Sequence, residues 1–268
     1  GLQLASLYNA MGRPDDAVSA YQKVLERNPG NAKARSELAK TYNNIANARS
    51  QAGDFETALL NVEQALLHDP DLPEAHTNRK AMLWNRALTT SETNPGRALD
   101  LYRAYAEMYP AWWQAHSEIG RIYLEQRDYL RAIAAFEDAA ALDPAATHNL
   151  ALAHHRQGVL LQRAGSGEDA ITHLKAAADL APAVTDFYRT LGQAHRAAGH
   201  HEEAVSAFRA ALAVDPELDW AGAEITKVSL SLGEAARQRG DWDEALRRFE
   251  EIPVERRVAS VHAILGWL

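Results

Sequence analysis

The stretch that decides the fold is Ala183–Pro216, which reads AVTDFYRTLGQAHRAAGHHEEAVSAFRAALAVDP. Small and apolar residues recur at helical spacing on both sides of Gly199, which predicts two short amphipathic helices joined by a tight turn. The proline at the end closes the unit, because proline cannot continue a helix. The marker residues of the unit, in chain order, are Leu191, Gly192, Gly199, Ala204, Phe208, Ala211 and Pro216.

Working outward, the same unit can be found seven times along the chain. The alanine equivalent to Ala204 stands at Ala17, Ala58, Ala98, Ala132, Ala170, Ala204 and Ala245. The fourth residue after it is large or apolar: Tyr21, Val62, Tyr102, Phe136, Leu174, Phe208 and Phe249. An offset of four places both residues on one helical face. Twelve residues after the first six alanines comes a proline: Pro29, Pro70, Pro110, Pro144, Pro182 and Pro216.

The turn between the two helices is marked by glycine five residues before the alanine in five of the seven units. These glycines are Gly12, Gly53, Gly165, Gly199 and Gly240. Glycine supplies the left-handed conformation that ends a helix. The third unit has Thr93 and the fourth has Arg127 at this place. In the third unit, Asn94-Pro95-Gly96 predicts a turn made by other residues.

This pattern resembles the tetratricopeptide repeat, a helix-turn-helix unit of about 34 residues. The resemblance implies an all-α, right-handed superhelical solenoid and a single array over residues 1–268. We place the repeats at approximately 1–30, 31–71, 72–111, 112–145, 146–183, 184–217 and 218–255. Residues 256–268, with Leu265-Gly266, carry the start of a further repeat.

The spacing of the alanines predicts which helices are long. Successive alanines lie 41, 40, 34, 38, 34 and 41 residues apart, which exceeds 34 by 7, 6, 0, 4, 0 and 7. Four and seven residues are close to one and two helical turns of about 3.6 residues each. We therefore expect elongated first helices in repeats two, three, five and seven. The excess of six in the third repeat predicts an added loop near Thr89–Gly96.

Composition limits the classes of partner and the cellular compartment that we expect. A formal net charge of −8 argues against a nucleic-acid partner, which a basic face would attract. No apolar run reaches about 18 residues, so we expect no membrane span. There are no cysteines, which fits a reducing compartment, and we expect a cytoplasmic location. No charged and then apolar leader follows Gly1-Leu2.

The residues that carry catalytic chemistry elsewhere have structural explanations here. His154-His155 and His200-His201 are adjacent pairs, and adjacent residues on a helix do not face one another. Acidic clusters fall at the starts of second helices, where negative charge favours the helix dipole. No triad spacing and no phosphate-binding loop is visible. We therefore expect no enzyme activity, no metal and no cofactor.

The resemblance also implies a binding surface, because first helices line the concave face in this family. The groove positions carried over by the resemblance are Asn43, Asn47, Ser117, Arg121, His155, Gln162, Arg189, Gln193, Arg196 and Arg237. Their four arginines predict a basic half-groove that suits carboxylates or phosphorylated segments. We expect a scaffold that binds a peptide or protein surface there.

Two alternatives to the scaffold are a regulatory module of a larger signalling enzyme and a structural subunit that self-associates through its repeat ends. Of Trp112-Trp113, one side chain either anchors a partner or packs locally. The family's carboxylate clamp for chaperone tails is absent, because its places hold Leu2 and Ser6 in one frame, and Asn43, Asn47, Gln114 and Glu118 in the other.

Overall fold

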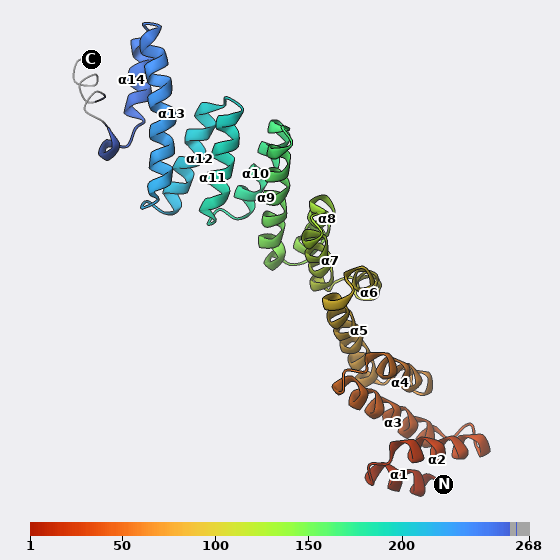
Figure 1. Ribbon diagram of the computed structural model, residues 1–268. Coiled ribbons are helices and arrows are strands. Elements are labelled where there is room, and N and C mark those ends of the chain that lie inside the picture. Colours follow the sequence, from red (N-terminus) through yellow and green to blue (C-terminus); the bar gives the residue numbers. More distant parts are fainter. Residues whose placement is uncertain (258–260, 262–268) are drawn as a thin grey trace. The chain divides into compact units, whose positions relative to one another are not determined.

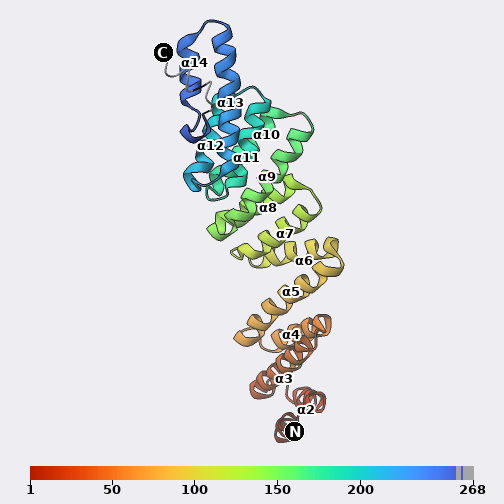
Figure 2. The ribbon, with the colours of Figure 1, turned by 60° about the vertical axis from the view of Figure 1, so that its left-hand side comes forward.

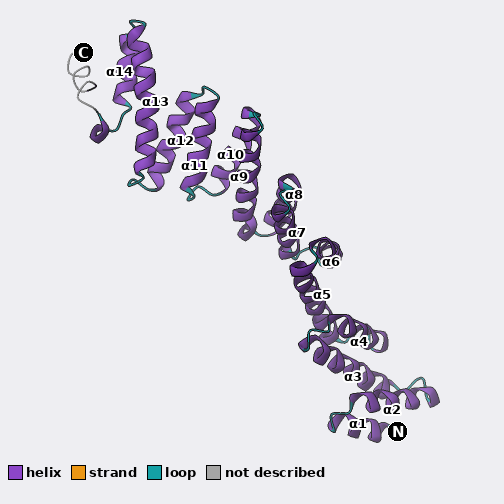
Figure 3. Ribbon diagram, in the orientation of Figure 1, coloured by secondary structure: helices purple, strands orange, loops and turns teal. Residues whose placement is uncertain are grey.

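The computed structural model describes residues 1–257 and residue 261. In these residues it contains fourteen α-helices, two short 3₁₀ helices and no strand (Figure 3). The α-helices are α1 (Leu2–Ala10), α2 (Pro14–Arg27), α3 (Ala32–Gln51), α4 (Phe55–His68), α5 (Pro73–Thr93), α6 (Pro95–Met108), α7 (Trp113–Glu125), α8 (Tyr129–Leu142), α9 (Thr147–Arg163), α10 (Gly167–Leu180), α11 (Thr185–Ala197), α12 (His201–Val214), α13 (Asp219–Gln238) and α14 (Trp242–Glu250). The 3₁₀ helices are η1 (Pro144–Ala146) and η2 (Val254–Arg256).

The helices form antiparallel pairs, with odd-numbered first helices and even-numbered second helices (Figures 1 and 2). Packing divides the chain into two compact units, Gly1–Ala115 and His116–Leu268. In the first unit each helix from α1 to α5 packs on the next helix in the chain, and α3 also contacts α5. In the second unit each helix from α8 to α13 does the same, and α9 also contacts α11. The all-α repeat fold is confirmed. The single array over residues 1–268 stays a prediction.

The predicted ladders form the interior of each pair. All seven marker alanines are fully buried, and the large residues four positions later are at most 1% exposed. The first helix presents a small residue to that large side chain. A Cβ on Gly192 would lie 2.4 Å from Cε1 of Phe208, and a Cβ on Gly233 would lie 2.5 Å from Cε1 of Phe249. Glycine therefore sets how closely these two helices approach.

The helix ends follow the predicted punctuation. The five turn glycines have φ between 69° and 85°, and Arg127 adopts φ 62° at the equivalent place in the fourth repeat. Each of the six second helices from α2 to α12 ends two residues before its proline. Asp54 and Asp241 cap the second helices that follow them, accepting from the backbone N–H of Thr57 (3.1 Å) and Glu244 (3.2 Å). Acidic residues at these helix starts thus have a structural role.

Length varies in the first helices and is constant in the complete second helices. The six second helices from α2 to α12 have 14 residues each. Among the first helices, α7 and α11 have 13 residues, α9 has 17, α3 and α13 have 20, and α5 has 21. The predicted elongation in repeats two, three, five and seven is confirmed.

The third repeat corrects one prediction, because the added loop near Thr89–Gly96 does not exist. The helix α5 continues to Thr93, and Asn94 is the single residue between α5 and α6. The Asn94 side chain caps α6 by accepting from the backbone N–H of Arg97 at 3.0 Å. A turn of one residue replaces the three-residue turns that separate the other complete pairs, such as 198–200 between α11 and α12.

The third repeat also explains why its alanine spacing exceeds 34 by six residues, which is not a whole number of helical turns. Its buried small residue is Ala87, one position later than the ladder spacing places it. Fourteen residues separate it from the start of α5 at Pro73, the same separation as from Ala32 to Ala46 in α3. The insertion in α5 is therefore seven residues, or two helical turns. The shortened turn removes one residue, so the spacing between the marker alanines increases by only six.

Two sequence expectations concern the end of the chain and the membrane. The further repeat predicted at Leu265-Gly266 lies outside the described residues. No helix in the described part of the chain has the length and apolar character needed to cross a membrane.

Candidate binding surface on the first helices

In the first unit, the two predicted groove residues differ in their surroundings. The Asn43 side chain is buried, and its Oδ1 accepts from Nδ2 of Asn78 at 2.9 Å. This hydrogen bond joins α3 to α5, so Asn43 contributes to packing. Asn47, one turn further along α3, is exposed. Of the two asparagines, Asn47 is the one available to a partner.

Polar contacts of this kind join successive first helices in both units. Nδ2 of Asn9 in α1 donates to Oγ1 of Thr41 in α3 at 2.8 Å. In the second unit, Nε2 of His155 in α9 lies 3.0 Å from Oγ1 of Thr190 in α11. Each contact fixes a polar side chain before any partner arrives. The sequence placed His155 on this face, but it did not indicate which residue on the next first helix it meets.

On α9, His155 is held on two sides and Gln162 is half-buried. The His155 ring stacks on Phe187 with centroids 4.8 Å apart. Burial lowers the pKa of His155, and the neighbouring charge of Arg156 lowers it further. The imidazole is therefore neutral at pH 7, where it contributes a hydrogen bond and no charge.

Three predicted residues lie along one face of α11, where Arg189, Gln193 and Arg196 are spaced by four and three positions and are all half-buried. The guanidinium of Arg189 lies 4.3 Å from the centroid of Trp220 and pairs with Asp186 at 3.3 Å. These contacts hold the α11 face in a defined conformation.

The remaining arginines of the predicted basic row also have carboxylate partners. Arg196 donates to Glu224 of α13 at 2.5 Å. Arg237 pairs with Glu234 at 2.9 Å. On α7, Arg121 pairs with two carboxylates, Glu118 at 2.7 Å and Glu125 at 2.6 Å, while Ser117 beside them is half-buried. Each arginine is locally neutralised, so the surface is a row of ion pairs and does not carry four unpaired positive charges.

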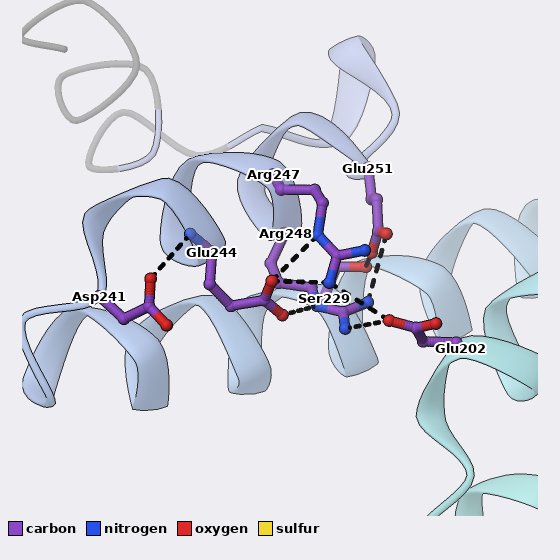
Figure 4. A network of polar contacts seen from close by, with 7 residues as sticks. All are labelled: Glu202, Ser229, Asp241, Glu244, Arg247, Arg248 and Glu251. Carbon is purple, nitrogen blue, oxygen red and sulfur yellow. Dashed lines mark hydrogen bonds and ion pairs between the residues drawn. The ribbon is translucent and has the colours of Figure 1, made fainter.

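A buried arginine on the second helix α14 was not among the residues predicted from the sequence. The Arg248 side chain is 7% exposed, and its guanidinium contacts Glu244 at 2.7 Å, Glu202 at 2.8 Å and Glu251 at 3.3 Å (Figure 4). The hydroxyl of Ser229 donates to Glu251 at 3.0 Å. Because Glu202 belongs to α12 and Ser229 to α13, this Arg248 cluster ties α14 to both preceding helices. The sequence did carry one signal of this cluster: Arg248 is charged, whereas the equivalent residue in the sixth repeat is Ala207.

The charges of the Arg248 cluster support one another. Arg247 reaches Glu244 at 2.6 Å and Glu202 at 3.2 Å (Figure 4). Hydrogen bonds from Arg248 and then Arg247 hold the pKa of Glu202 below its ordinary value, and hydrogen bonds from Arg247 and then Arg248 do the same for the pKa of Glu244. Every contact is internal, so the cluster is a structural tie between repeats six and seven.

Histidines form a second polar contact inside the fifth repeat. Nδ1 of His154 in α9 lies 2.9 Å from Nδ1 of His173 in α10. Because His155 faces Phe187 on the next first helix, the two adjacent histidines point to different neighbours, as expected. Among the described residues, no three potential ligands of the His, Asp or Glu type are grouped closely enough to hold a metal ion.

The two adjacent tryptophans both end up half-buried. The Trp112 ring packs edge-on against Trp84 with centroids 6.4 Å apart, and Nζ of Lys80 lies 3.9 Å from its centroid. Trp112, the first residue of the fourth repeat, therefore packs locally against the third repeat.

These helix pairs, with ladders of small and large residues inside each pair and polar residues on the outer faces of the first helices, define a helical-repeat solenoid, a class that offers extended surfaces to partners. Four family models, each described as a tetratricopeptide repeat, match residues 2–68, 113–146, 155–219 and 228–251. The chain belongs to the tetratricopeptide repeat family. The third repeat, with its single-residue turn, lies outside these four matches.

Several solved structures are similar to this chain at low sequence identity. MamA is 22% identical, with 67% of this chain and 92% of that chain covered and a TM-score of 0.39. YrrB, titled a TPR protein with an unusual peptide-binding site, is 18% identical, with 76% and 96% covered and a TM-score of 0.36. A repeat-containing protein from Cytophaga hutchinsonii is 12% identical, with 99% of both chains covered and a TM-score of 0.36. A search of curated protein sequences found no match.

Proposed function

We propose that this chain is a non-catalytic interaction scaffold that binds a peptide or protein segment along its first helices. The observation that carries the proposal is the face of α11, where Arg189, Gln193 and Arg196 present hydrogen-bond donors from positions fixed by Asp186, Trp220 and Glu224. Side chains that are already ordered lose less conformational entropy when a partner binds.

The absence of cysteine is the one feature of the chain that favours a cytoplasmic location.

The pairing of the arginines changes the kind of partner that we propose. A row of unpaired guanidinium groups would attract phosphorylated segments, because each phosphate carries close to two charges. Here each predicted arginine already has a carboxylate within 3.3 Å. The surface as a whole therefore fits a segment with mixed polar groups better than a phosphorylated one.

A photoreactive amino acid at Gln193 tests this proposal, with the same amino acid at Arg209 as the matched control. Arg209 is exposed on the second helix α12, outside the first-helix surface. We expect a partner to be crosslinked from Gln193 and not from Arg209. The dissociation constant of the identified partner should rise when Arg189→Glu and Arg196→Glu are combined. Equal capture from both positions, or an unchanged dissociation constant, contradicts the proposal.

Self-association is a second candidate, favoured by the outer face of α1. Leu4, Leu7 and Met11 lie at spacings of three and four and are 48%, 54% and 57% exposed. Exposed leucines in such a stripe favour contact with another apolar face. Light scattering across a wide concentration range tests this. A mass that stays monomeric throughout rejects self-association through α1.

A further inference from the structure

A small cleft lies where α11, the start of α12 and the middle of α13 meet. Its volume is about 250 Å³, and we call it the Arg196 cleft. The lining residues are Arg196, His201, Lys227, Val228, Ser231 and Leu232. They come from two successive first helices and from the second helix between them.

The cleft carries one surplus positive charge. Arg196 is matched by Glu224 at 2.5 Å, while Lys227 is exposed and makes no ion pair within the described part of the chain. Nδ1 of His201 is buried and has no hydrogen-bond partner among those residues. The cleft thus offers an unmatched ammonium group in a protein whose net charge is −8.

Apolar and polar residues lie side by side in the cleft. Val228 and Leu232 are spaced by four on α13, directly beside Lys227 and Ser231, which have the same spacing. Val228 is 4% exposed and Leu232 is half-buried, so they form an apolar strip next to the polar one. A ligand that fits both strips combines one negative charge with an adjacent aliphatic group.

We propose that the Arg196 cleft anchors an acidic side chain, followed by an aliphatic residue, in a peptide segment of a partner protein. One carboxylate charge equals the one surplus positive charge, whereas a phosphate dianion exceeds it. The proposal rests on the proposed scaffold function and assigns it one anchoring point. The acidic preference expected for the whole basic half-groove is thereby confined to a single cleft.

Peptide titrations followed by NMR test this assignment on the full chain labelled with ¹⁵N and ²H. The probe is acetyl-Gly-Gly-Glu-Leu-Gly-Gly-amide, and its matched control has Gln in place of Glu. We expect saturable shifts of the Ser231 and His201 amide signals with the Glu peptide and much smaller shifts with the Gln peptide. Lys227→Glu should weaken binding by at least about fivefold, since it reverses the charge of one ion pair. Arg209→Glu should leave the dissociation constant unchanged.

Three results overturn the proposal. These are equal shifts with the Glu and Gln peptides, equal weakening by Lys227→Glu and Arg209→Glu, and the absence of shifts up to roughly 20 mM peptide, a concentration that detects even millimolar binding. The crosslinking experiment at Gln193 is independent of these results. Successful crosslinking with a failed titration rejects the anchoring point and leaves the scaffold function in place, whereas failed crosslinking at Gln193 rejects the scaffold function.

Discussion

The sixth and seventh repeats share one interior contact and differ at the residue beside it. In both, a glycine of the first helix faces a phenylalanine of the second, Gly192 with Phe208 and Gly233 with Phe249. The residue before the phenylalanine is Ala207 in the sixth repeat and Arg248 in the seventh. The Arg248 guanidinium contacts three carboxylates, and through Glu202 and the Ser229–Glu251 hydrogen bond the Arg248 cluster connects α14 to α12 and α13.

The difference follows the lengths of the second helices. The sixth repeat ends in α12 with 14 residues, whereas α14 has only 9. A short helix buries less apolar surface, so ionic contacts supply a larger share of what holds α14 in place. Two repeats with the same marker residues therefore depend on different forces.

The largest effect that we expect comes from Arg248→Ala. Removal of one partner from a buried ion pair costs about 3 to 5 kcal/mol, and we expect the lower end because Glu202 is largely exposed and can be rehydrated. Hydrogen exchange should show lost protection in α14 with little change in α9 and α10. Arg209→Ala, on the exposed face of α12, is the control and should cost less than about 0.5 kcal/mol. Equal costs for the two variants would show that the Arg248 cluster does not stabilise α14.

The next effect tests the shared glycine–phenylalanine contact. Gly192→Ala and Gly233→Ala each place a methyl group within 2.5 Å of a phenylalanine ring, so each should lower the free energy of unfolding by about 1 to 3 kcal/mol. Urea titration measures both losses. Gly167→Ala is the control, because a Cβ there has no atom within 4 Å and the residue has no positive φ. A loss in one repeat only would mean that the two contacts are not equivalent.

A smaller effect of opposite sign is expected at the turns. The sixth and seventh repeats have glycine at the left-handed turn position, whereas the fourth has Arg127 with φ 62°. A residue with a Cβ is less stable than glycine in this conformation by about 1 kcal/mol. Arg127→Gly should therefore raise the midpoint of urea unfolding, and Gly199→Ala should lower it. A lower midpoint for Arg127→Gly would contradict the conformational explanation.

The smallest effect that we expect is a difference in pH dependence: the fifth and sixth repeats should lose stability at a higher pH than the seventh. Burial lowers the pKa values of His154, His155, His173 and His195 in the fifth and sixth repeats. Their stability contribution is present above the ordinary histidine pKa of about 6.5 and is lost as the pH falls through the lowered values. Residues 218–255 of the seventh repeat contain no histidine. Glu202 of α12 and Glu244 of α14, which both contact Arg248, lose their contribution only at lower pH, as their own lowered pKa values are reached.

Hydrogen exchange at several pH values measures this separation. Protection in α9 and α10 should decrease first as the pH falls from 7.5, before protection in α14 does. In His154→Phe combined with His173→Phe the early decrease should be smaller. Simultaneous loss in all three helices would contradict the proposed role of the histidines.

Much of the fold could be predicted because the ladders are strictly periodic. Ala17 and its six equivalents stand at a fixed offset from a large residue, and the first six also stand at a fixed offset from a proline; this pattern determines the buried face and the helix end. The third repeat was harder to predict, because the number of residues between successive marker alanines is the sum of an insertion in α5 and a deletion in the turn. Only the burial of Ala87 separates the two changes.

The candidate surface could be predicted less well, because a periodic pattern indicates which helix face a residue lies on but not which residue of another helix it contacts. The arginines were placed on the first helices correctly, but Glu224, which neutralises Arg196, stands 28 residues later in the added turns of α13. Arg248 was missed because Glu202, which pairs with it from α12, stands 46 residues earlier in the chain, although Glu244 and Glu251 are close to it in sequence. Such long-range pairs depend on the crossing of helices.

Contacts between neighbouring helices also determine how this chain acquires its structure. Within each unit, a helix packs on the next helix along the sequence, and successive first helices also contact one another, as α3 does with α5 and α9 with α11. Chains with such local contacts close only short loops during folding, and they fold faster than chains of equal size that pair distant strands. Folding can begin at any repeat and spread to its neighbours. Under a pulling force, the same arrangement should release the chain repeat by repeat, with α14 and its Arg248 cluster detectable as one step.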